Sequence, residues 1–290
     1  MNQVDLHVHS TTSDGTFTPT ELVDYAIEKG LTAFALTDHD TIDGIPEAVK
    51  YANEKKKEGY TLEVIPGVEL SSEYEKKDIH IVGLFVDLNR PAFTNKMQEF
   101  VDARIGRNKL MCEKLTAAGL PMTFDELTAH YPGAVITRAH YANFMLEKGY
   151  ISSKKEAFER YIGDYCPCFV SREKVTPVDA IQLIISAHGI PILAHPTLYH
   201  LGSEQLEVLV KMLKENGLVG IEGLYSTYTS SEENQIKRLA KKYDLQISGG
   251  SDFHGATKDK LDLACGYGNL FVPEEILTNL KAVKKELYCD

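Results

Sequence analysis

Short apolar runs and helix-like segments alternate along the first 90 residues of the chain. The apolar runs are typical of buried β-strands, whereas the segments between them repeat apolar residues every three or four positions, as one face of a helix does. The predicted order is strand, helix, strand, helix, strand, strand. We expect strands at 4–9, 31–37, 62–68 and 79–86, and helices at about 18–30 and 45–57.

Helix-start signals support this pattern. Thr18 suits the N-cap of a helix, Pro19 suits the first helical position, and Glu21 completes a capping box. The same arrangement returns at 176–179, where Thr-Pro-Val-Asp opens a later helix. The local sequence therefore predicts where these helices begin.

After residue 90 the chain carries helix signals and almost no strand signals for about 75 residues. Apolar residues from Met97 to Leu115 recur at helical spacing, and Gly119 marks the end of that helix. This stretch is expected to form a small helical cap inserted into the main domain. We expect the main domain at 1–90 and 169–290, and the cap at 91–168.

Alternation of strands and helices resumes after the insertion. We expect strands at 190–194, 218–222 and 245–248, and helices at 177–188, from 203, at 230–242 and at 273–287. The seven strands, most of them separated by helices, predict an α/β fold with mainly parallel strands and helices outside. In α/β barrels the active site lies at the C-terminal ends of the strands.

Composition and charge limit the class of protein. The hydrophobic fraction of 43% suits a globular chain, and no apolar run approaches the roughly 20 residues of a membrane span. The N-terminus has no signal-peptide pattern and the five cysteines form no zinc or disulfide pattern, so we expect a cytoplasmic protein without a membrane partner. The net charge of −11 disfavours stable binding of duplex DNA. It permits a short anionic substrate, because bound divalent metals reverse the field locally. The oligomeric state stays open.

The first strand carries candidate metal ligands. Alternate residues of a strand point to the same face, so His7 and His9 project together. Alone, this His-x-His pattern is equally compatible with two polar residues near a terminus. Further His, Asp and Glu residues lie at the ends of other predicted strands, however. The complete strand-end set is His7, His9, Asp14, His39, Glu69, His80, His195, Asp252 and His254.

The mixture of imidazole and carboxylate groups suits zinc, manganese or iron, and nine ligands suit two or three ions rather than one. Two such ions a few Å apart clamp a phosphoryl group for attack by water, and Glu69 is the candidate for the bridging carboxylate. Structural alternatives exist for single members. His80 could be a core histidine, Asp14 could organise an Asp-Gly turn, and His195 could pack in a loop. The aspartates on either side of His39 could cap the next helix.

Seven motifs follow one another along the chain. They are Asp-Leu-His-Val-His at 5–9, Ser-Asp-Gly at 13–15, Thr-Asp-His-Asp at 37–40, Pro-Gly-Val-Glu at 66–69, Ile-His-Ile-Val-Gly at 79–83, Ala-His-Pro at 194–196 and Gly-Ser-Asp-Phe-His at 250–254. Together they resemble, in order, the motifs of the polymerase and histidinol phosphatase (PHP) family, outside the insertion. A His-x-His strand alone would equally suggest an amidohydrolase, but the Thr-Asp-His-Asp and Ser-Asp-Phe-His motifs favour PHP.

The resemblance implies a distorted (β/α)7 barrel with a trinuclear metal site, usually of manganese, iron or zinc. It implies one ion on His7, His9, Asp252 and Glu69, a second on Glu69, His80 and His195, and a third on Asp14, His39 and His254. The last three residues are also the candidate proton carriers. The choice among them stays open.

The insertion resembles that of a PHP subgroup that hydrolyses nucleotide 5′-phosphates, including 3′,5′-bisphosphonucleotides, and trims short RNA from the 5′ end. That subgroup has a Ser/Thr-Arg-x-His segment, which Thr137 to His140 matches. Its arginine reaches the substrate phosphate, so Arg138 and the first backbone N–H groups of its helix could bind one phosphate together. The alternative is a solvated surface arginine. His140 is a weaker substrate-binding candidate. Many relatives carry a histidine shortly after the Ile-Glu strand, where this chain has Gly-Leu-Tyr-Ser-Thr-Tyr at 223–228; if that histidine helps to bind substrate, either Tyr228 substitutes for it or the specificity differs.

The expected activity is that of a metal-dependent phosphoesterase, in which a metal-bound hydroxide attacks the phosphorus of a nucleotide or short oligonucleotide. One alternative is a phosphatase for a small metabolite such as histidinol phosphate. Another is a metal-binding PHP module without turnover, which the full ligand set disfavours. Nucleic-acid binding without catalysis conflicts with the net charge of −11.

Overall fold

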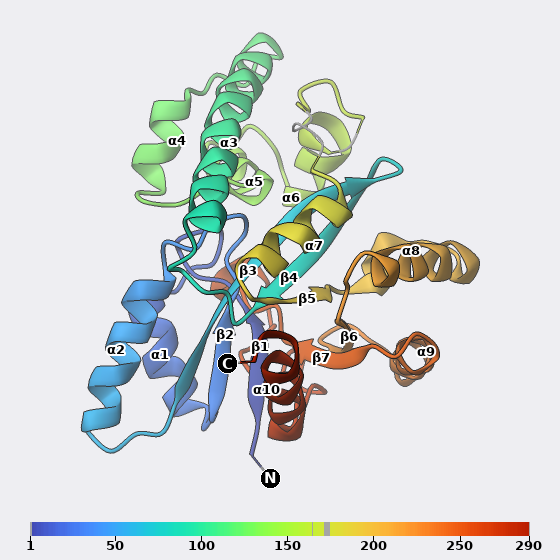
Figure 1. Ribbon diagram of the computed structural model, residues 1–290. Helices are drawn as coiled ribbons and strands as arrows, with labels where there is room; N and C mark the ends of the chain where they lie inside the picture. Colours follow the sequence, from blue (N-terminus) through green and yellow to red (C-terminus); the bar gives the residue numbers. More distant parts are fainter. Residues whose placement is uncertain (1, 164, 171–174, 290) are drawn as a thin grey trace.

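The computed structural model describes residues 2–163, 165–170 and 175–289, and a seven-stranded sheet surrounded by helices dominates it (Figure 1). Neighbouring strands follow one another in chain order, and the sheet is nearly closed into a barrel. The strands are β1 (Val4–Val8), β2 (Ala33–Leu36), β3 (Glu63–Tyr74), β4 (Lys77–Leu84), β5 (Ile190–Leu193), β6 (Gly220–Tyr225) and β7 (Gln246–Gly250). The helices around them are α1 (Pro19–Glu28), α2 (Ile45–Lys57), α7 (Pro177–Ser186), α8 (Ser203–Glu215), α9 (Ser230–Lys242) and α10 (Glu274–Tyr288). The predicted α/β barrel is confirmed.

The chain segments at the ends of β1 and β7, which carry the His7–His9 and Asp252–His254 motifs, lie side by side. The amide of His9 donates to the carbonyl of Phe253 at 2.9 Å, and the amide of Asp252 donates to the carbonyl of His7 at 2.9 Å. Gly250 permits this approach, because a Cβ there would lie 2.5 Å from the backbone nitrogen of His7. Segments from opposite ends of the sequence therefore form one side of the site.

Strand β4 runs opposite to its neighbours. It is antiparallel to β3 and β5, whereas the other neighbouring pairs of the sheet are parallel. The prediction that the third strand ends near Glu69 is wrong, because β3 continues to Tyr74 and a turn at Glu75 and Lys76, with φ of 47° and 66°, leads into β4. Because β4 is reversed, His80 near its start lies at the same edge as the C-terminal ends of the parallel strands.

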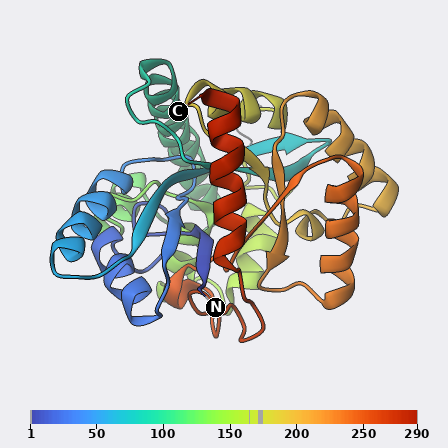
Figure 2. The same ribbon diagram turned by 60° about the horizontal axis from the view of Figure 1, so that its bottom comes forward.

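Two hydrophobic layers hold the barrel. One joins the outer face of the strands to the surrounding helices, as where Leu22 of α1 packs with Phe34 of β2 in one buried cluster. The other joins Leu6 of β1 to Leu277 and Leu280 of α10. Helix α10, which crosses in front of the strands in Figure 2, begins beside the N-terminal end of β1. The apolar interior is thus covered at that end, and the charged side chains gather at the other.

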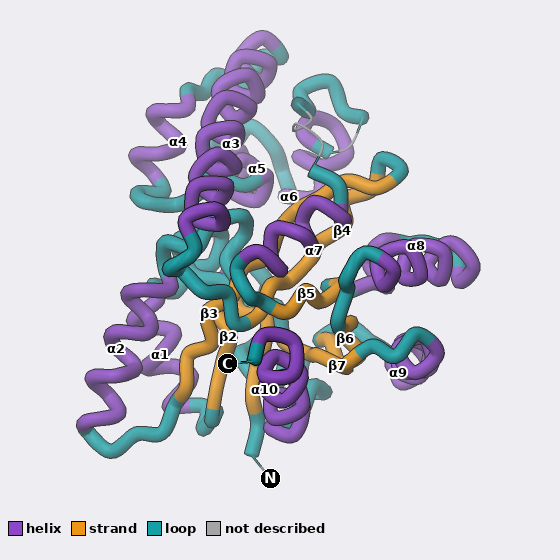
Figure 3. The backbone as a smooth tube through the Cα atoms, in the orientation of Figure 1, coloured by secondary structure: helices purple, strands orange, loops and turns teal. Residues whose placement is uncertain are grey.

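The chain between β4 and α7 is helix and loop wherever the structure describes it (Figure 3). Its helices are α3 (Pro91–Ala117), α4 (Phe124–His130), α5 (Arg138–Glu147), α6 (Lys154–Ala157) and a π-helical turn (Phe158–Ile162). They share a hydrophobic cluster of their own, which includes Leu115, Leu127 and Tyr141. The division of the chain into a barrel domain and a cap domain stays a prediction. Within the described ranges, no helix has both the length and the apolar character of a membrane span.

Candidate metal centre

The nine side chains of the strand-end set meet at one edge of the barrel. Each has a polar atom within 3.3 Å of another member of the set. They come from β1 and the residue after it (His7, His9), the next loop (Asp14), the segment after β2 (His39), β3 (Glu69), β4 (His80), the segment after β5 (His195) and the segment after β7 (Asp252, His254). Positions near strand ends, together with the reversed direction of β4, therefore bring together residues that span most of the chain.

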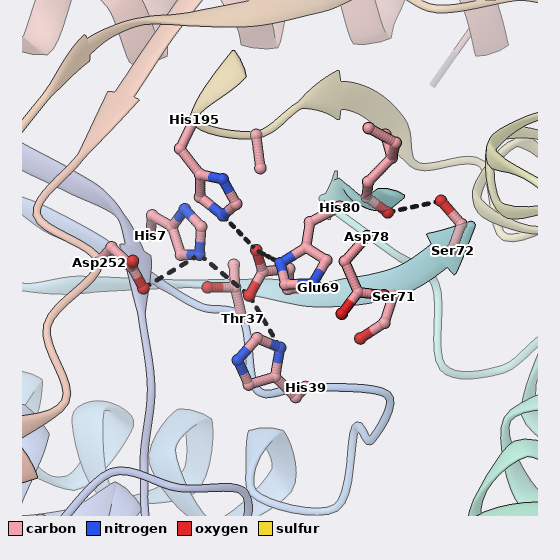
Figure 4. Close-up of polar contacts among 12 residues, drawn as sticks. His7, Thr37, His39, Glu69, Ser71, Ser72, Asp78, His80, His195 and Asp252 are labelled. Atoms are coloured by element: carbon pink, nitrogen blue, oxygen red, sulfur yellow. Dashed lines mark hydrogen bonds and ion pairs between the residues drawn. The ribbon is translucent and has the colours of Figure 1, made fainter. Parts of the chain in front are cut away.

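Glu69 lies at the centre of this group (Figure 4). Its Oε1 is 2.9 Å from Nδ1 of His80 and 3.0 Å from Nε2 of His195. Its Oε2 is 2.9 Å from Nδ1 of His39 and 3.3 Å from Nε2 of His7. The two carboxylate oxygens face different imidazoles, which is what a carboxylate bridging two ions requires.

Asp14 anchors a second part of the centre. Its Oδ1 is 3.2 Å from Nε2 of His254 and 3.8 Å from Nε2 of His39. The ring of His9 stacks on that of His254 with centroids 4.0 Å apart. Donor atoms lie within 4.8 Å of one another in three overlapping groups: His9–Asp14–His39–His254, His7–His9–Glu69 and His39–Glu69–His80.

Glu222 on β6 was not predicted from the sequence, yet it orients two members of the set. Its Oε1 is 2.7 Å from Nδ1 of His7, and its Oε2 accepts the amide hydrogen of His195 at 2.6 Å. A carboxylate only accepts, so Nδ1 of His7 carries the proton and Nε2 is presented to the centre. One signal was available in the sequence, because glutamate within an apolar strand is rarely buried without a partner.

One carboxylate oxygen of Asp252 faces the other members of the set, and the second is hydrogen-bonded to residues that do not belong to the set. Its Oδ1 is 3.2 Å from Nε2 of His9. Its Oδ2 accepts from the hydroxyl of Tyr225 at 2.6 Å and from the ammonium group of Lys258. Neither Tyr225 nor Lys258 was predicted. These contacts fix the carboxylate although its backbone lies in the left-handed region, with φ of 57°.

The aspartates beside His39 do not cap the next helix, so that alternative is wrong. Asp38 accepts from the hydroxyl of Ser13 at 2.5 Å and thereby holds the loop that leads to Asp14. Asp40 accepts from the amide of Ser71 at 2.8 Å. Helix α2 begins after a glycine that provides no side-chain cap. Asp38 thus fixes the loop that carries Asp14, and Asp40 binds strand β3, which carries Glu69.

Charge in the centre is balanced by protons when no cation is bound. Burial lowers the pKa of His9, but hydrogen bonds to Asp252 and Glu69 outweigh this effect and raise the pKa to about 9. Burial raises the pKa of Asp14, Glu69 and Asp252, but cationic neighbours outweigh it and hold each carboxyl pKa well below its usual value. Burial lowers the pKa of His254 to about 4, which leaves its ring neutral. Metal ions and protons would therefore compete for this centre.

The donor set fits divalent transition metals. Oδ1 of Asp14 and Oε2 of Glu69 are buried, and neither accepts an aligned hydrogen bond from any described residue. An unsatisfied buried acceptor costs about 1–3 kcal/mol, a cost that a bound cation would offset. Imidazole nitrogens together with carboxylate oxygens suit zinc, manganese or iron better than calcium or magnesium.

The substrate-binding candidates differ in position. Arg138, the first residue of α5, contacts Asp78 of β4 at 2.5 Å. Asp78 lies two positions before His80 on that strand. His140 is buried, and its Nδ1 accepts the amide hydrogen of Thr137 at 2.9 Å. Tyr228 is buried in the main hydrophobic core. Arg138 thus lies beside the metal centre, whereas the ring of His140 holds the first turn of α5.

Known proteins resemble the chain over most of its length. The family model described as PHP domain matches residues 5–176. A 5′-3′ exoribonuclease of Haemophilus influenzae is 41% identical over 250 residues, which cover 86% of this chain and 89% of that protein. A 3′,5′-nucleoside bisphosphate phosphatase of Chromobacterium violaceum is 32% identical over 255 residues, or 88% of each chain. The solved structure of a protein assigned as a metal-dependent phosphoesterase, from Bifidobacterium adolescentis, superposes with a TM-score of 0.82 at 25% identity and covers 97% of this chain and 96% of that one.

Proposed function

Because the chain belongs to the PHP domain family, we propose that it hydrolyses the 5′-phosphate of nucleotides, including 3′,5′-bisphosphonucleotides, and trims short 5′-phosphorylated RNA. It is a metal-dependent phosphoesterase. The observation that carries the proposal is the position of Glu69, whose two oxygens face separate imidazoles among nine convergent donors. The similarity to an exoribonuclease and to a nucleoside bisphosphate phosphatase supports a nucleotide as substrate.

The centre would hold two to three ions of manganese, iron or zinc, as the donor chemistry favours. We assign one ion to His7, His9, Asp252 and Glu69, a second to Glu69, His80 and His195, and a third to Asp14, His39 and His254. When bound, these ions would activate water as a nucleophile and neutralise the charge that develops on the phosphoryl oxygens. Glu222 supports the first two groups by orienting His7 and the backbone of His195.

Arg138 is the residue we assign to the substrate phosphate. Its partner Asp78 is 47% exposed, so this ion pair contributes little stability and a phosphate dianion can replace the carboxylate. The first backbone N–H groups of α5 lie at the same end of the helix and favour an anion. We assign His140 to positioning this helix start rather than to the substrate.

Proton transfer during hydrolysis falls to Asp14, His39 or His254. Asp14 is ionised at neutral pH because the neighbouring imidazoles lower its pKa despite burial, so its carboxylate is a weak base that can orient a proton donor. His254 is neutral, and its Nδ1 lies 2.9 Å from the carbonyl of Asp252, which directs Nε2 towards Asp14. These side chains could pass a proton between water and the leaving oxygen.

The test is turnover of the Mn²⁺-loaded protein with three substrates side by side. They are a nucleoside 3′,5′-bisphosphate, the matching 5′-monophosphate and a short 5′-phosphorylated RNA. Released phosphate is measured for the first two and chain shortening for the third, with histidinol phosphate as the comparison substrate. We expect turnover of nucleotides above that of histidinol phosphate. No product from any of the three nucleotide substrates would contradict the proposal.

A further inference from the structure

A buried ion pair connects the helical insertion to the segment that carries His39. Arg104 on α3 is 3% exposed, and its Nη2 contacts Oδ2 of Asp40. Asp40 also accepts from the amide of Ser71 on β3 at 2.8 Å and from the hydroxyl of Ser71 at 3.1 Å. Removing one partner of such a pair leaves a buried charge without compensation. The position of Asp40 is therefore set jointly by the barrel and by the insertion.

Asp40 determines where His39 points. It follows His39 directly, and its φ of 51° is in the left-handed region, which residues other than glycine adopt only when their surroundings hold them there. Its amide donates to the carbonyl of Glu69 at 3.0 Å, so the chain turns sharply and passes beside β3. In this conformation Nδ1 of His39 lies 2.9 Å from Oε2 of Glu69.

The same arginine also supports Asp14, through α5. Nη1 of Arg104 and Nδ2 of Asn108 both point to the carbonyl oxygen of Ile136, at 3.5 Å and 3.0 Å. The next residue, Thr137, donates its hydroxyl hydrogen to Oδ2 of Asp14 at 3.1 Å. Oδ1 of Asp14 remains directed towards His254 and His39.

We propose that Arg104 is a positioning residue through which the helical insertion completes the third proposed ion site, formed by Asp14, His39 and His254. Two of these three donors, His39 and Asp14, are held by contacts that lead to the insertion. His7 is oriented from within the barrel by Glu222 instead. The inference rests on the proposed metal-binding role of this group. It gives the insertion a part in metal binding, in addition to the substrate contact proposed for Arg138.

The experiment measures Mn²⁺ affinity and Mn²⁺ content per chain, by titration and by elemental analysis after dialysis. The variant is Arg104→Met, and its matched control is Arg107→Met on the same helix, where a second buried arginine donates to the carbonyl of Val170. We expect Arg104→Met to bind Mn²⁺ about 10–100-fold more weakly at one group and to lose about one ion per chain, as changes to groups that orient metal ligands do. Arg107→Met should keep the wild-type content.

A second pair of variants decides the question if Arg104→Met does not fold. Thr137→Val keeps the shape of the side chain and removes only the hydroxyl that binds Asp14, whereas Thr137→Ser keeps the hydroxyl. We expect the Thr137→Val variant to bind Mn²⁺ more weakly than the wild-type protein does. The Thr137→Ser variant should bind Mn²⁺ with wild-type affinity. Folded Arg104→Met or Thr137→Val protein with wild-type affinity and content would overturn the inference. Wild-type protein that binds no Mn²⁺ would instead overturn the proposed metal centre itself.

Discussion

Replacing Glu222 by glutamine tests how strongly the metal centre depends on a residue outside the donor set. Glu222 is 1% exposed at its side chain, and both of its oxygens are occupied, one at 2.7 Å from Nδ1 of His7 and one at 2.6 Å from the amide nitrogen of His195. The change Glu222→Gln keeps the shape but leaves a single acceptor oxygen and adds a donor. Only one of the two neighbours can then keep the hydrogen bond that it donates to Glu222.

Both orientations of the glutamine are unfavourable. If its oxygen faces His7, its NH₂ group faces the buried N–H of His195, and two donors oppose each other. If it is flipped, its NH₂ group faces Nδ1 of His7, and the proton of that ring must move to Nε2, the nitrogen directed at Glu69. One unsatisfied buried donor costs about 1–3 kcal/mol of unfolding free energy. The second orientation also blocks the nitrogen proposed as a metal ligand, so we expect metal affinity to fall about 10–100-fold.

Urea denaturation and Mn²⁺ titration measure the two effects. The control is Glu63→Gln, the same chemical change at an exposed glutamate paired with Lys281, which should alter the unfolding free energy by about 0.5 kcal/mol or less. If Glu222→Gln keeps both the wild-type stability and the wild-type Mn²⁺ affinity, the argument that this carboxylate fixes the tautomer of His7 is refuted.

Three further predictions follow from the site. His9→Ala should abolish turnover and lower the bound metal while the circular dichroism spectrum stays unchanged, and unchanged turnover would contradict the metal assignment. Burial lowers the pKa of His140 to about 4, below the usual 6.5. The folded state therefore binds fewer protons than the unfolded chain between these values, and this residue's contribution, present above pH 6.5, is lost as the pH falls towards 4, by roughly 3 kcal/mol. His140→Gln, which preserves a cap acceptor, should flatten that part of the acid denaturation profile, and an unchanged profile would contradict the assignment. Arg138→Met should raise KM for nucleotides more than it lowers kcat in steady-state assays, and an unchanged KM would argue against a phosphate contact.

The nine proposed metal-binding residues could be selected from the sequence because strand periodicity is local. His7 and His9 share a face through alternation alone, and residues that end parallel strands gather at one edge whatever lies between them. His80 was selected as a strand-end residue although it lies near the start of its strand. Only the reversed direction of β4 explains why it reaches the same edge. The extension of β3 to Tyr74 was missed because its last residues are polar, and pairing with β4 stabilises them instead.

The sequence by itself determined the class of fold, the starts of the capped helices and the residues proposed as donors. These depend on spacing and on chemistry carried by single side chains. The tertiary structure decided which groups orient the donors. Glu222 reaches His7 across 215 positions, Arg104 reaches Asp40 across 64, and Thr137 reaches Asp14 across 123. Such contacts leave no periodic pattern, because they form only when separate elements pack and bury polar groups that must then find partners. Of the residues proposed as donors, His7 and His9 come from the first strand and the residue after it, and Glu222 from the far half of the barrel and Thr137 from the helical insertion contact His7 and Asp14.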